Sequence, residues 1–94
     1  MNNAHKGSTF DSFLEKEKLL DQVEATAIKR VIAHQLEYAM EKQRISKTKM
    51  ANTMHTSRSS VDRLLDPENA SVTLQSLVKA AHAVGQELQI SFVD

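Results

Sequence analysis

Apolar residues recur every three or four positions through most of the chain, and this spacing predicts a succession of helices. A short helix is expected over residues 8–21, because Ser8 and Asp11 have the spacing of a capping box. Asp21 then serves as N-cap of a longer helix that runs to about residue 43. The apolar stripe of this second helix is typical of a core-facing helix and consists of Val23, Ala27, Ile28, Val31, Ile32, Leu36, Ala39 and Met40.

Two shorter helices are predicted next, over residues 47–54 and 58–65. Each is preceded by a serine that can cap it, Ser46 for the first and Ser57 for the second. Only three residues separate the two helices. The second should end before Pro67, because the residue that precedes a proline is driven out of helical dihedral angles.

A final helix and a strand are predicted at the end of the chain. Thr73 can cap the helix, and Gly85 suits the left-handed residue just past its end. From residue 87 the apolar positions alternate with polar ones, which is the period of a strand over residues 87–94. No second strand is evident, so we expect this strand to pair across a homodimer through Leu88, Ile90 and Phe92.

These elements predict an all-α fold of five helices with a short C-terminal strand. The 94 residues suffice for one domain. We divide the chain into a disordered tail over residues 1–7, a helical extension over 8–21, a helical domain over 22–86 and the strand over 87–94. The polar N-terminus has no signal core, so we expect a soluble, cytoplasmic protein without membrane association.

The charges are unevenly distributed, although the formal net charge is zero. Residues 41–63 hold six basic and two acidic side chains, a local balance of +6 − 2 = +4, whereas both flanks are neutral to acidic. Local positive charge favours a polyanionic partner such as nucleic acid, because phosphates are neutralised by lysine and arginine. The alternative is an ordinary solvated helix face.

The two short helices have the features of a helix-turn-helix over residues 47–66. Such a unit needs a small residue where its helices approach, and Ala51 occupies that place. Its turn usually holds a glycine with a positive φ, whereas this sequence has His55. Histidine is among the few other residues enriched in the left-handed region, so the turn is strained but allowed.

The second short helix carries the candidate base-reading residues. With its apolar residues turned inward, Arg58, Ser59, Asp62 and Arg63 lie on its outer side, which is the edge that such units insert into the major groove. Both arginines can bind guanine, and Ser59 can meet either kind of base edge. Asp62 can accept from cytosine or pair with Arg58 instead. The alternative is a solvated, salt-bridged surface.

Candidate phosphate contacts surround these residues. Lys47 and Thr48 begin the first short helix, where free N–H groups and the helix dipole favour an anion. Arg44 and Lys49 lie nearby in the sequence. Ser57 and Ser60 are further candidates, although helix capping alone explains Ser57.

Enzyme chemistry has little support in the sequence. The chain has no cysteine, and its four histidines are far apart, so neither a thiol nucleophile nor a metal site is expected. Two glycines cannot form a phosphate-binding loop. We expect neither catalytic residues nor a metal or other cofactor.

Several segments resemble the Xre, or lambda-repressor-like, helix-turn-helix family. They are residues 45–51, 56–61 and 64–65 and the closing run 74–85. Residues 7–14 and 62–67 resemble, more narrowly, short antitoxins of the HigA type. This resemblance implies a five-helix DNA-binding domain, a repressor that autoregulates its operon, and a neighbouring ribonuclease toxin that it neutralises. It also assigns base contacts to Arg58, Ser59 and Arg63 and a phosphate contact to Lys47.

Two other functions stay open. The protein can be a solitary regulator of the phage type, since similar proteins act without a toxin. It can also be a protein-binding module that uses the helix-turn-helix as a scaffold. In that case an amphipathic N-terminal helix with Phe10, Phe13, Leu14 and Leu20 docks the partner, although the same residues can instead close the core of the domain.

Overall fold

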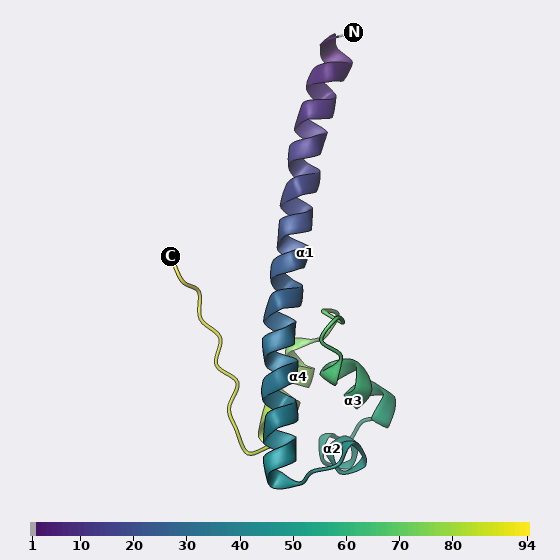
Figure 1. The fold of residues 1–94 in the computed structure, drawn as a ribbon, viewed down its shortest axis with the longest axis vertical. Coiled ribbons are helices and arrows are strands. Elements are labelled where there is room, and N and C mark those ends of the chain that lie inside the picture. The colour runs from purple at the N-terminus through teal and green to yellow at the C-terminus, as the bar shows by residue number, and fades with distance from the viewer. Residues whose placement is uncertain (1) are drawn as a thin grey trace.

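The computed structural model describes the backbone of residues 2–94 and the side chains of residues 15–94. Within this part the protein is all-helical, with α1 over Asn2–Gln43, α2 over Lys47–Met54, α3 over Arg58–Leu65 and α4 over Leu74–Ala83. The shape is elongated, 63 × 30 × 19 Å, because α1 extends far beyond the other helices (Figure 1). The prediction of five helices was therefore wrong in number.

The predicted break at Asp21 is absent, and α1 is one continuous helix of 42 residues. An N-cap residue needs non-helical dihedral angles, whereas an aspartate inside a helix costs only about 0.7 kcal/mol or less. The sequence from residue 8 to 43 holds no glycine or proline to stop the helix. Residues 2–7, expected as a disordered tail, also lie in α1. The side chains of Phe10, Phe13 and Leu14 lie outside the described residues.

The hydrophobic core lies where the C-terminal part of α1 meets α2, α3 and α4. Its most deeply buried side chains, Met50, Val61 and Val84, come from α2, α3 and the end of α4. The inward residues of α1 have the spacing of three and four that a buried helix face requires. They are Ala33, Leu36, Ala39 and Met40. The core therefore joins α1 only from residue 29 onward, and the preceding turns project into solvent (Figure 1).

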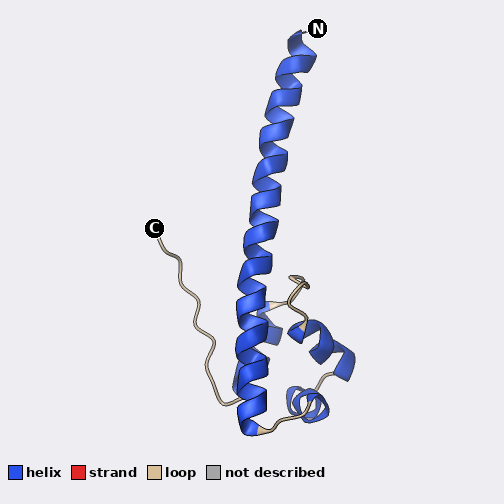
Figure 2. Ribbon diagram, viewed as in Figure 1, coloured by secondary structure: helices blue, strands red, loops and turns tan. Residues whose placement is uncertain are grey.

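The C-terminal segment departs from its prediction. Residues 86–94 form an extended segment without strand pairing (Figure 2). A strand needs a neighbour to satisfy its backbone groups, and the described chain supplies none. Leu88 is half-buried, whereas Ile90 and Phe92 are exposed. The predicted strand is thus absent from the single chain, and pairing between two chains stays a prediction.

A buried lysine fixes α1 to the end of α3. The Nζ atom of Lys29 donates hydrogen bonds to the backbone oxygens of Asp66 at 2.8 Å, Asn69 at 2.8 Å and Arg63 at 3.2 Å. Lys29 is only 2% exposed. Its burial lowers the pKa of the ammonium group, and the nearby carboxylate of Asp66 opposes this shift. A cation at these carbonyls also complements the negative end of the α3 dipole.

Replacing Lys29 with methionine should destabilise the protein measurably. The substitution keeps the apolar stem but removes a donor from three carbonyl oxygens and leaves that of Asn69 unsatisfied, at a cost of about 1–3 kcal/mol. Arg30→Met is the matched control. Its guanidinium forms a 2.7 Å ion pair with Glu68 at the surface, and such exposed pairs are worth about 0–1 kcal/mol. Urea unfolding of both variants measures the difference, and equal losses of stability would contradict this role of Lys29.

Candidate nucleic-acid interface

The helices α2 and α3 have the predicted bounds, and both predicted N-caps are confirmed. The hydroxyl of Ser46 accepts a hydrogen bond from the N–H of Lys49, and that of Ser57 accepts one from the N–H of Ser60, each at 3.1 Å. Ala51 is buried, as the close approach of two helices requires. The capping bonds fix where each helix begins, and therefore which residues occupy its first turn.

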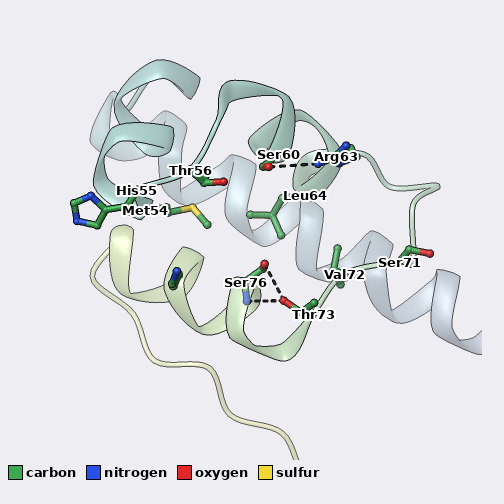
Figure 3. A pocket seen from close by; sticks show the side chains of 11 residues that line it. Met54, His55, Thr56, Ser60, Arg63, Leu64, Ser71, Val72, Thr73 and Ser76 are labelled. Atoms are coloured by element: carbon green, nitrogen blue, oxygen red, sulfur yellow. Dashed lines mark hydrogen bonds between the residues drawn. The ribbon is translucent and has the colours of Figure 1, made fainter.

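The turn between α2 and α3 contains the predicted left-handed residue. His55 has φ 56° and ψ 47°, and its N–H donates to the carbonyl of Asn52. The N–H of the next residue, Thr56, donates to the carbonyl of Ala51 at 2.9 Å. These bonds satisfy the carbonyls at the end of α2. The imidazole is exposed and points away from the helices (Figure 3).

Replacing His55 with glycine should therefore stabilise the fold. Glycine adopts a positive φ without the penalty of about 1–2 kcal/mol that other residues have. Its greater conformational freedom in the unfolded chain offsets part of this stabilisation. We expect a net stabilisation of about 0.5–1 kcal/mol in chemical denaturation. His55→Ala is the control, because alanine retains the steric penalty. A glycine variant no more stable than the alanine variant would contradict the assigned strain.

All four predicted base-reading residues are exposed on α3. The opposite side of the helix is held in the core by Val61, Leu64 and Leu65. The exposed group consists of Arg58, Ser59, Asp62 and Arg63. The structure therefore presents their polar groups together along one accessible helix, which begins at its N-terminus with Arg58.

Asp62 has a partner that the sequence analysis did not identify. Its carboxylate oxygen Oδ1 lies 2.9 Å from the Nζ atom of Lys47, so the ion pair links α3 to α2. The two side chains are 51% and 45% exposed, and water screens their attraction. The alternative of a pair between Asp62 and Arg58 is not the arrangement found. A predicted base-reading residue and the leading predicted phosphate contact thus lie together.

Other predicted contacts surround this pair. Lys47, Thr48 and Lys49 are exposed in the first turn of α2. Arg44 follows α1 with a left-handed φ of 56° and lines a shallow groove together with Lys47. The structure therefore brings Arg44 to the start of α2. The dimerisation candidates Leu88, Ile90 and Phe92 belong to the separate C-terminal segment (Figure 1).

A groove between α3 and α4 places residues beside α3 that the sequence analysis did not connect with it (Figure 3). It has a volume of about 280 Å³. Arg63 is among its lining residues, and its Nη2 atom donates to the hydroxyl of Ser60 at 3.4 Å. The groove is also lined by the hydroxyl groups of Thr73 and Ser76 and by Lys79. Thr73 and Ser76 are recognisable in the sequence as hydroxyl residues. Their position beside α3 could not be predicted, because they are distant from α3 along the chain.

No three histidine, aspartate or glutamate side chains among the described residues gather as a metal site would require. No helix in this part of the chain combines the length and apolar character needed to cross a membrane. Comparison with protein-family models, with curated proteins and with solved structures found no match.

Proposed function

We propose that the protein is a sequence-specific DNA-binding transcriptional regulator whose α3 is the recognition helix. The main support for this proposal is the exposed face of α3, which carries two arginines, a serine and an aspartate. The opposite side of the helix is buried in the core. Helices of this kind read base edges with residues near their N-terminus. The neighbouring lysine on α2 lies where a phosphate contact would orient the unit.

The ion pair between Lys47 and Asp62 has a role in this proposal. In the free protein the pair neutralises both groups at the boundary of α2 and α3. A DNA phosphate competes for the ammonium of Lys47, and the carboxylate of Asp62 is then available to accept from a cytosine amino group. Because the pair is exposed, separating it costs only about 0–1 kcal/mol. Phosphate binding and base reading are thereby coupled.

Sequence discrimination should depend on Arg58 and Arg63. Selection from a random DNA pool would supply the operator, and the double variant Arg58→Ala/Arg63→Ala should lose its preference for it. Each bidentate contact with guanine is worth about 1–3 kcal/mol, so operator affinity should fall by at least about 30-fold at fixed salt. Lys18→Ala/Arg30→Ala is the charge-matched control on α1. Equal affinities of the wild type and the Arg58/Arg63 variant would refute the proposal.

Lys47 should contribute to DNA affinity through its charge and should not contribute to the discrimination between DNA sequences. Lys47→Gln removes one phosphate contact, so the slope of the logarithm of affinity against the logarithm of salt concentration should decrease by about one. The loss should be similar for the operator and for random DNA. Titrations of both DNAs at several salt concentrations measure the slope. A loss confined to the operator would instead indicate that Lys47 reads a base.

The biological setting of the proposal rests on the resemblance to the Xre family and to HigA-type antitoxins. The protein would act in the cytoplasm as a homodimer on a palindromic operator, with half-sites about 34–36 Å apart. It would repress its own operon and neutralise a toxin encoded beside it. Co-purification with the product of the neighbouring gene tests this part, and a regulator without such a partner would be the solitary, phage-type alternative.

A further inference from the structure

The long helix α1 carries an apolar stripe on the side away from α2, α3 and α4. At about 100° per residue, the stripe lies opposite the face that packs into the core. Its large apolar side chains are each more than half exposed: Leu20 62%, Val23 58%, Val31 57% and Tyr38 58%. Ala27 and His34 complete it and are exposed as well. The stripe extends over five helical turns, from the projecting part of α1 to the part that holds the core.

The projecting part of α1 has no packing partner within the chain. From residue 15 to 28 all side chains are exposed except that of Thr26, which is half-buried. A helix in water is only marginally stable unless an apolar face is buried. Several neighbouring apolar residues on one exposed face also mark an interaction surface more often than scattered ones do. The stripe therefore requires a binding partner with an apolar surface of similar length.

We infer that this binding partner is the same stripe of a second copy of the chain, with the two α1 helices antiparallel. Aligning Ala27 with Val31 of the second copy sets the register. Leu20 then faces Tyr38 of the second copy. In both contacts, Ala27 with Val31 and Leu20 with Tyr38, a smaller residue packs against a larger one. Two-fold symmetry repeats every contact, as the closed interface of a homodimer requires. The inference does not depend on DNA binding.

One polar contact within the stripe favours this arrangement. In the same register Glu24 faces His34 of the second copy, where an imidazole N–H can donate to the carboxylate. At the ends of the stripe, Lys16 comes level with Lys42 and Glu17 with Glu41 of the second copy, and each of these charges has an opposite charge one residue along the partner helix. The ammonium of Lys42 lies 5.5 Å from the centre of the Tyr38 ring, which places it at the edge of the stripe.

A parallel pairing is much less favourable. It would place each residue near its own copy and so bring Glu24 to Glu24, in place of the contact between Glu24 and His34. Such juxtaposition of like charges suppresses an interface. In the antiparallel register the like charges that meet near the two-fold axis are the two copies of Arg30, and each is already paired with its own Glu68 at 2.7 Å. The two copies of Ile28, 55% exposed, meet on the other side of the axis.

Sedimentation of the full-length protein over a range of concentrations tests the surface. Ala27→Glu/Val31→Glu places carboxylates against one another across the pair and should raise the dimer dissociation constant at least about tenfold. Gln22→Glu/Ala25→Glu is the matched control, because it adds the same charge to the opposite side of the same helix and should leave the constant within about twofold. A wild type that is monomeric up to its solubility limit would overturn the inference, as would a dimer that the stripe variant leaves unchanged.

Engineered cysteines test the direction of the helices, since the chain has no thiol of its own. A mixture of Glu24→Cys and His34→Cys should form the mixed disulfide on oxidation, and Glu24→Cys alone should not cross-link. Efficient cross-linking of Glu24→Cys alone would establish parallel helices and overturn the register. Deletion of residues 87–94 completes the test. A dimer that is lost on this deletion and survives Ala27→Glu/Val31→Glu would place the contact in the C-terminal segment instead.

Discussion

The burial of one side of α3 is the constraint on which the candidate interface depends. Val61, Leu64 and Leu65 are at most 6% exposed, and their packing against α1, α2 and α4 allows only one rotation of the helix about its axis. The polar residues between them are then necessarily outside. Lys29 adds a second constraint, because its hydrogen bonds hold the carbonyl end of α3 and the following turn against α1. Together these contacts present a short helix of eight residues in a defined orientation.

Local features of the sequence were sufficient to predict the bounds of α2 and α3 and the turn between them. Ser46, Ser57 and Thr73 cap the helices that follow them, and His55 and Gly85 have the expected positive φ. These assignments succeed because a cap or a left-handed residue involves atoms only a few positions apart. The exposure of the residues assigned to base reading also follows from the spacing of their buried neighbours.

Features that depend on distant parts of the chain were not predictable in this way. Lys29 bonds to residues 34 to 40 positions away, and Lys47 pairs with Asp62 from a different helix. Asp21 illustrates a different difficulty, because the same residue can start a helix or sit inside one at small cost. The predicted strand failed because alternation of apolar residues shows only that a segment can pair, and pairing requires a neighbour.

Amide chemical shifts, measured while the protein is titrated with the selected operator, show whether α3 reads DNA. We expect the largest changes on residues 58–63 and on the first turn of α2, and we expect those on residues 58–63 to weaken when random DNA of the same length replaces the operator. Changes that are identical for the two DNAs, or that are confined to the projecting part of α1, would contradict the assignment of α3 as a recognition helix.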